Sequence, residues 1–236
     1  MSVTDMQQHL ILFDCDGTLV DSHAHIVNTM QKAMTACQLS APDDGAVSEV
    51  VGLSLERAVE VLIPDEESVV QAQVTEHYRR LYLRPGSPQP LFPGVRRTLD
   101  ELAARGYWMG IVTGKSRRGL ARVMDEHDLH SWVMVSRTPD ECPSKPHPDM
   151  VTECADEMGM DVGQVTVVGD ACFDIEMALS AGAQAIGVSY GAQSADRLRE
   201  AGAGHIVDRF EALLERFPPL QPINRPSSTE GIGEYT

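Results

Sequence analysis

The sequence is poor in basic residues. Its 236 residues include 19 Lys and Arg against 35 Asp and Glu, which gives a formal net charge of −16 at pH 7. A surface with this excess of negative charge repels polyanions, so we expect neither nucleic acids nor anionic membranes as partners. A phosphorylated small molecule is not excluded, because the field inside a cleft depends on the metal ions and lysines that line it.

The sequence also lacks paired cysteines, a secretion signal and a long apolar run. The five cysteines show no Cys-x-x-Cys spacing, and their odd number favours reduced thiols in a cytoplasmic protein. The first ten residues hold no basic segment before an apolar stretch, and no window is long enough to cross a membrane. With 42% hydrophobic residues, the chain can form one sizeable core and a small insert.

The sequence does contain short apolar runs that alternate with amphipathic stretches. The apolar runs lie at 107–113, 132–136, 165–170, 185–188 and 205–207, and the helical stretches lie near 95–105, 116–127, 147–158, 173–181, 193–201 and 208–216. This alternation predicts a parallel sheet with helices on both faces, which is the doubly wound, Rossmann-like α/β fold.

The segment 22–84 has a different pattern, with helical periodicity and no convincing strand. A Pro- and Gly-rich stretch follows at 84–94 and predicts a hinge or linker. The end of the chain holds four prolines and no periodicity, which is typical of a poorly ordered extension. We therefore expect a core formed by 1–20 and 90–217, a helical insert at 21–89 and a flexible tail at 218–236.

The most informative run extends from His9 to Ser22. Its apolar residues 9–13 predict a buried strand, which ends in Asp14 and Asp16. Two like charges this close destabilise a buried strand end unless a cation or a shared proton separates them. The run therefore predicts a divalent metal, an acid/base pair, or both, at the edge where parallel sheets bind ligands.

Three further motifs follow along the chain. They contain Thr113 in GIVTGK, Lys145 in SKPHPD, and Asp170 with Asp174 in VVGDACFD. Together with the Asp-x-Asp-Gly-Thr that begins at Asp14, they resemble the signature of the haloacid dehalogenase superfamily, and within it the capped phosphatases related to phosphoglycolate phosphatase. The resemblance implies that the helical insert is a four-helix cap. It also implies hydrolysis of a small phosphorylated metabolite, phosphoglycolate-like or a sugar phosphate, through an aspartyl phosphate.

The carboxylates of these motifs suit phosphoryl transfer with a metal. Asp14 is the expected nucleophile, and Asp16, on the same face, is the expected general acid and base. Mg²⁺ prefers such oxygen ligands. The resemblance implies that the carboxylates of Asp14 and Asp170 bind Mg²⁺ directly. It also implies that Asp16 binds the ion through its backbone carbonyl and that Asp174 holds a metal-bound water. Asp174 also fits an acid stabilised by a helix N-terminus.

The remaining candidates would bind the phosphoryl group or the rest of the substrate. Thr113 and Gly114 end a strand and could hold phosphoryl oxygens, although a Thr there is also an ordinary helix cap. Lys145, flanked by prolines, would pair with Asp14 and the phosphate. Gly52 and Arg57 lie where the family has its substrate-specificity loop, but an exposed helix position explains Arg57 better.

Other functions share parts of this pattern. A phosphomutase of the β-phosphoglucomutase kind has the same cap and motifs, although the plain Gly-Asp-x-x-x-Asp favours a phosphatase. A phospho-acceptor receiver module combines acids, Mg²⁺, a Thr and a Lys, but it is shorter and has no cap. A haloacid dehalogenase would leave Asp16 without a role. The substrate cannot be named from the fold, and a monomer or a homodimer is expected.

Overall fold

The computed structural model of the chain describes residues 8–83 and 89–220. Its centre is a six-stranded sheet with the order β3-β2-β1-β4-β5-β6, in which every neighbouring pair is parallel. The strands are β1 (Leu10–Phe13), β2 (Trp108–Val112), β3 (Val133–Arg137), β4 (Val165–Gly169), β5 (Gln184–Val188) and β6 (His205–Val207). This order is that of a doubly wound α/β fold, so the predicted fold class is confirmed.

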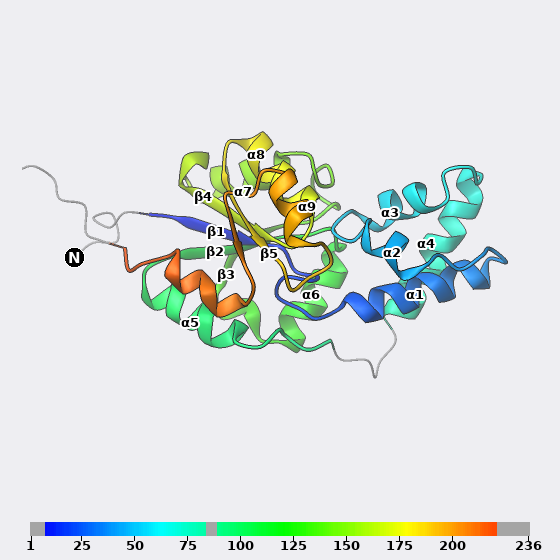
Figure 1. Cartoon of the computed structure of the whole chain (residues 1–236), viewed down its shortest axis with the longest axis horizontal. Coiled ribbons are helices and arrows are strands. Elements are labelled where there is room, and N and C mark those ends of the chain that lie inside the picture. The colour runs from blue at the N-terminus through cyan, green and yellow to red at the C-terminus, as the bar shows by residue number, and fades with distance from the viewer. Residues whose placement is uncertain (1–7, 84–88, 221–236) are drawn as a thin grey trace, which may run out of the picture.

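Helices cover both faces of the sheet (Figure 1). One face carries α5 (Val95–Ala104), α6 (Arg117–Glu126) and the 3-10 helices η2 (Leu129–Ser131) and η4 (Phe210–Glu215). The other carries α7 (Asp149–Glu157), η3 (Val162–Gln164), α8 (Cys172–Ala181) and α9 (Ala195–Glu200). In β1, Ile11 and Phe13 pack into the first layer, and Leu10 and Leu12 into the second. Burial on both faces explains why this strand is apolar throughout rather than alternating.

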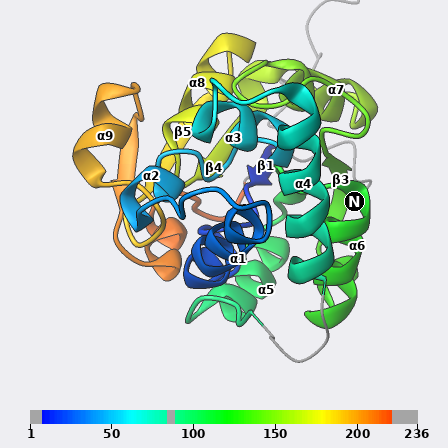
Figure 2. The same cartoon turned by 90° about the vertical axis from the view of Figure 1, so that its right-hand side faces the viewer.

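The segment between β1 and α5 forms four helices beyond the carboxyl ends of the strands (Figures 1 and 2). They are α1 (His23–Ala36), α2 (Asp44–Ser48), α3 (Leu55–Leu62) and α4 (Ser68–Tyr82). Their apolar faces meet in a separate small core that includes Met30, Val47 and Val74. This helical group therefore buries its own apolar surface and stands over the end of the sheet where β1 and β4 finish.

Two details at the C-terminal side differ from the sequence-based expectation. The predicted helix at 208–216 is the 3-10 helix η4, in which Phe210 and Leu213 are both buried. An i, i+3 pair falls on one line of a helix with three residues per turn, so this spacing suits a 3-10 helix. In addition, the first residues of the expected tail lie against the core, where the backbone N–H of Leu220 donates to the carbonyl of Arg105 (3.1 Å). The remainder of the tail, 221–236, lies outside the described residues, as do 84–88 of the expected hinge.

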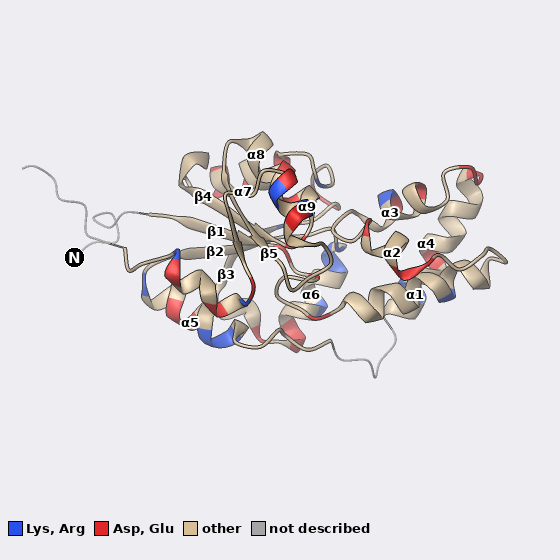
Figure 3. Cartoon of the chain, viewed as in Figure 1, with Lys and Arg blue, Asp and Glu red and all other residues tan. Residues whose placement is uncertain are grey.

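Charged residues lie mainly on the helices and loops rather than on the strands of the sheet (Figure 3). Within 8–83 and 89–220, none of the helices combines the length and the apolar character that a membrane crossing requires.

Candidate active site

Two neighbouring strands bring Asp14 and Asp170 together. Asp14 follows β1 and Asp170 follows β4, and the backbone N–H of Asp14 donates to the carbonyl of Val168 (2.9 Å). Between β1 and β4 the chain changes from one half of the sheet to the other, which is where ligands bind in this fold. The hydroxyl of Thr18 (3.1 Å) and the backbone N–H of Ala192 (2.7 Å) both donate to the carboxylate of Asp170 and fix its orientation.

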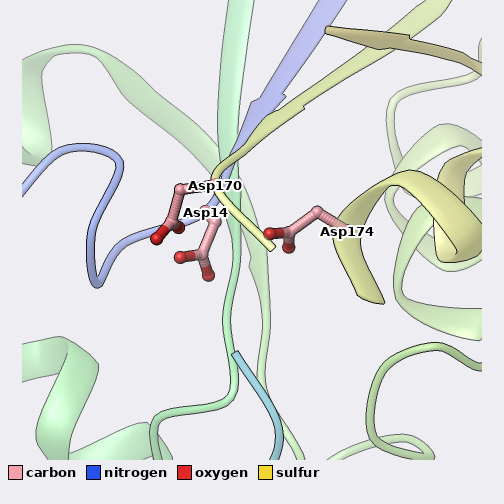
Figure 4. Close-up of side chains that lie close together, drawn as sticks. All are labelled: Asp14, Asp170 and Asp174. Atoms are coloured by element: carbon pink, nitrogen blue, oxygen red, sulfur yellow. The ribbon is translucent and has the colours of Figure 1, made fainter. Parts of the chain in front are cut away.

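Asp174 completes a group of three carboxylates (Figure 4). It lies in the first turn of α8, and its Oδ2 accepts a hydrogen bond from the backbone N–H of Ala171 (3.0 Å). Each of Asp14, Asp170 and Asp174 offers an oxygen within 4.8 Å of the others. All three side chains are buried, so water screens their repulsion poorly.

Lys145 is the cation of this cluster. Its Nζ donates to Oδ1 of Asp14 (2.5 Å) and to Oδ1 of Asp174 (2.6 Å), and its side chain is fully buried. Burial alone would lower the pKa of Lys145, but the two carboxylates outweigh it and hold the pKa above its ordinary value. The cluster thus has one ammonium group for three carboxylates, and Asp170 has no cationic partner among the described residues.

The cluster has the properties of a divalent metal site. Oδ2 of Asp14 is buried and has no hydrogen-bond partner within the described part of the chain. Burial raises the pKa of Asp14 to about 7 against the opposing effect of Lys145, and burial with the neighbouring acids raises that of Asp170. A divalent cation would offset both the repulsion and the missing contact. Oxygen donors of this kind are the ligands that Mg²⁺ prefers, so the residues fit the predicted cofactor.

Gly17 makes room for this arrangement. Its φ is +82°, and a Cβ atom there would lie 2.1 Å from Oδ2 of Asp170. Glycine is therefore required at this position both by the backbone conformation and by the close approach of the carboxylate.

Asp16 lies beside the cluster and is bound by residues that the sequence analysis did not identify. Its Oδ1 accepts from the hydroxyl of Ser22 (2.5 Å) and pairs with Nζ of Lys115 (2.8 Å). Lys115 also donates to the hydroxyl of Tyr82 (2.6 Å), at the end of α4. Burial alone would lower the pKa of Lys115, but Asp16 and its other neighbours hold it well above the ordinary value. The core and the helical group thus meet at Lys115, which pairs with Asp16 of the core and donates to Tyr82 of the helical group.

Thr113 and Gly114 line the same cavity as Asp14 and Asp16. The hydroxyl oxygen of Thr113 accepts from the backbone N–H of Lys115 (3.2 Å), which leaves its hydrogen available to a ligand. A Cβ atom at Gly114 would lie 2.2 Å from the carbonyl oxygen of Leu53, so this turn is in close contact with the helical group.

The structure separates the two candidates of the specificity loop. Gly52 lines the cavity, and a Cβ atom there would lie 3.1 Å from Cβ of Ala171 in the core. Arg57 does not line it; its side chain is 61% exposed and pairs with Glu60 on the surface (2.8 Å). The contacts therefore support a role at the site for Gly52 and offer none for Arg57.

The cavity joins the sheet end to the helical group and has a volume of about 130 Å³. The carboxylates of Asp14 and Asp16 and the turn at Thr113 form its floor. Residues of the helical group line the rest, together with Ser116, Gly119, Pro139 and Asp140 of the core. A phosphoryl group on the floor would meet a nucleophile with a free oxygen, a second carboxylate and hydrogen-bond donors, while the rest of the molecule would lie among the helices.

Comparisons with known proteins agree with this arrangement. Residues 11–188 match the sequence model of the family described as haloacid dehalogenase-like hydrolases. The chain is 32% identical over 210 residues to "Probable phosphatase IndB" of Dickeya dadantii (strain 3937), covering 87% of this chain and 91% of that one. It is 30% identical to a phosphoglycolate phosphatase of Photorhabdus laumondii, covering 86% and 90%. A hydrolase of Pseudomonas syringae has a similar solved structure, with a TM-score of 0.81, 23% identity and coverage of 89% and 97%.

Proposed function

The chain belongs to the haloacid dehalogenase-like hydrolases, and from this premise we propose that it hydrolyses a small phosphorylated metabolite in a Mg²⁺-dependent reaction through an aspartyl phosphate on Asp14. Its relatives are named phosphatases, and the chain is a phosphoric monoester hydrolase. The observation that carries the proposal is the buried, unpartnered Oδ2 of Asp14, beside two further carboxylates and on the floor of a cavity.

In the first step, a carboxylate oxygen of Asp14 attacks phosphorus while the hydrogen bond from Lys145 orients the carboxylate. The bond between phosphorus and the ester oxygen breaks, and Asp16 gives its proton to that oxygen. In the second step, Asp16 takes a proton from a water that attacks the aspartyl phosphate. This releases inorganic phosphate and restores Asp14.

The metal would be held by Asp14, Asp170 and the backbone carbonyl of Asp16, with Asp174 acting through a water. When bound, Mg²⁺ supplies positive charge to the phosphoryl oxygens as negative charge builds up on them. Thr113, Gly114 and Lys145 would hold the phosphoryl group, and Gly52 would contact the rest of the substrate. We take helices α1 to α4 as the cap, because they close the cavity from the side opposite to the sheet.

Metal dependence is the direct test of this proposal. EDTA should remove the hydrolysis of p-nitrophenyl phosphate, and added Mg²⁺ should restore it. Ca²⁺ should restore little, because its looser and higher coordination would misplace Asp14 relative to phosphorus. The assay is release of p-nitrophenol and of inorganic phosphate, and full activity in excess EDTA would contradict the proposed roles of Asp14 and Asp170.

The role of Asp16 as a general acid can be distinguished from that of the nucleophile, because the effect of replacing Asp16 should depend on the leaving group. An Asp16→Asn variant should hydrolyse alkyl phosphates ~10²–10⁴-fold more slowly, as expected for loss of a general acid. The loss should be smaller for p-nitrophenyl phosphate, because its leaving oxygen needs less protonation. Equal losses of kcat for the two kinds of ester would show that Asp16 is not the acid.

The fate of the phosphoryl group distinguishes this proposal from the two alternatives. Membership in a hydrolase family gives no support to a receiver module. A phosphomutase would return the phosphoryl group to its sugar, so inorganic phosphate would not accumulate over many turnovers. Steady release of inorganic phosphate from a phosphate ester over many turnovers would therefore favour the phosphatase over the phosphomutase. The proposal also places the protein in the cytoplasm. Its five cysteines are free thiols, of which Cys15, Cys142 and Cys154 are buried, and reduced thiols are typical of that compartment.

A further inference from the structure

The cavity above Asp14 extends into the helical group, where its walls are apolar. The insert residues that line it and carry no charge, apart from Gly52, are Ile26, Met30, Val47, Val50, Val51, Leu53, Leu55, Ala58, Tyr78, Tyr82 and Leu83. Several of them, including Met30 and Val47, are otherwise buried in the small core of the helical group. On the side of the helical group, the space that receives the leaving group of a phosphate ester is thus walled by hydrocarbon and two aromatic rings, with Glu56 and Arg79 as its charged residues.

The charged groups along this wall already have partners. Arg79 and Glu56 pair with each other, and both side chains are about half exposed (49% and 53%). On the core side, Lys115 is held by Asp16 and by the hydroxyl of Tyr82. Among the described residues that line the cavity, no cation is therefore left for a second anionic group of a substrate.

The size of the cavity limits the leaving group to one ring. The volume of about 130 Å³ includes the floor where the phosphoryl group would lie, and an apolar cavity of roughly 150 Å³ binds benzene. The rings of Tyr78 and Tyr82 stack with their centroids 5.4 Å apart and offer an aromatic surface to a neighbouring ring.

We infer that the leaving group of the substrate is an apolar alcohol about the size of one ring, so that the substrate is an aryl-alkyl or similarly apolar phosphate monoester. This inference rests on the proposed function and narrows its substrate. The carboxylate of phosphoglycolate would lose its hydration in this cavity without gaining a cation. The hydroxyl groups of a sugar would likewise lose their hydration among side chains that offer few hydrogen bonds.

The test compares benzyl phosphate, ethyl phosphate and 2-phosphoglycolate with Mg²⁺ present. All three are esters of primary alcohols, so differences in kcat/KM report mainly on the leaving-group cavity. We expect benzyl phosphate to exceed ethyl phosphate by about 10- to 100-fold, the effect of burying one ring. We expect phosphoglycolate to fall below ethyl phosphate. A higher kcat/KM for phosphoglycolate or for glucose 6-phosphate than for benzyl phosphate would overturn the inference.

A matched pair of variants on α3 locates the effect. Ala58→Leu fills part of the cavity and should reduce the benzyl-to-ethyl ratio at least ~10-fold, because the ring no longer fits. Val61→Leu places the same leucine side chain at an exposed position of the same helix and should leave the ratio unchanged. The ratio does not depend on how much of a preparation is folded. An unchanged ratio in folded Ala58→Leu would overturn the inference.

A binding measurement on the wild-type protein tests the same inference if Ala58→Leu does not fold. In wild-type protein with Mg²⁺, benzylphosphonate should bind at least ~10-fold more tightly than ethylphosphonate by calorimetry, again because of the buried ring. Equal affinities would contradict the inference. If p-nitrophenyl phosphate and all the alkyl esters resist hydrolysis, the proposed function itself fails, whereas hydrolysis without a benzyl preference refutes only the apolar leaving group.

Discussion

An Asp14→Asn variant should hydrolyse no phosphate ester at a useful rate and should remain folded. The amide cannot attack phosphorus, so we expect a loss of roughly 10⁴-fold or more in kcat. Stability should not suffer from the change in charge, because the variant removes one of three mutually repelling buried carboxylates, two of which pair with Lys145. Lys145 keeps its hydrogen bond to Asp174 (2.6 Å). Phosphate release and circular dichroism of the same preparation would measure both effects.

Two further variants show whether position or charge matters at this site. Asp14→Glu keeps the negative charge but moves the carboxylate by one methylene, and a displacement of about 1 Å can cost ~10²-fold in rate. Asp156→Asn makes the same chemical change as Asp14→Asn at an exposed position of α7 and should leave kcat unaltered. Substantial hydrolysis by Asp14→Asn would reject the aspartyl-phosphate mechanism, whatever the behaviour of the other two.

The strands of the core could be predicted from the sequence because they are buried on both faces. The apolar runs at 107–113 and 165–170 correspond to β2 (Trp108–Val112) and β4 (Val165–Gly169), within one residue at each end. Continuous apolar runs separated by amphipathic helices are the direct consequence of a parallel sheet between two helical layers. The segment η4 was harder to predict, because the spacing of Phe210 and Leu213 suits an α-helix as well as a 3-10 helix.

The meeting of Asp14 and Asp170 could be anticipated in part, since each follows an apolar run that forms a strand. That the two strands are neighbours depends on the strand order, which only the motif resemblance implied. The contact of Lys115 with Asp16 was not predicted, although Lys115 directly follows Thr113 and Gly114 in the motif. Tyr82 had no signal at all, because its position depends on how the helical group sits over the sheet.

The cavity could not be predicted for a similar reason. Residues such as Met30, Val47 and Ala58 follow the apolar pattern of ordinary core positions, and the sequence does not show which of them face an empty space. For Arg57 the sequence favours an exposed helix position over a role in the specificity loop, and its exposed side chain and surface pair with Glu60 agree with that interpretation.

A Lys145→Met variant should lose both activity and stability. The substitution keeps a long side chain but leaves Asp14, Asp170 and Asp174 buried without a cation from the protein. Removing one partner of a buried ion pair typically costs about 3–5 kcal/mol, so the free energy of unfolding in urea should fall by about that amount. We expect kcat to fall at least ~10²-fold, because Asp14 loses the group that orients it. Lys32→Met, at an exposed position of α1, should change neither quantity.

Added Mg²⁺ should restore much of the stability of Lys145→Met but little of its activity. A ligand that binds only the folded state stabilises it in proportion to the logarithm of its concentration relative to Kd. The variant presents three buried carboxylates without a compensating ammonium group, so it should bind the divalent cation more tightly than the wild type does. At a given Mg²⁺ concentration, its melting temperature should therefore rise by more than that of the wild type. The same or a smaller rise would show that Lys145 and the metal do not offset the charge of the same carboxylates. Activity should stay low because the cation adds charge without replacing the hydrogen bond from Nζ to Oδ1 of Asp14.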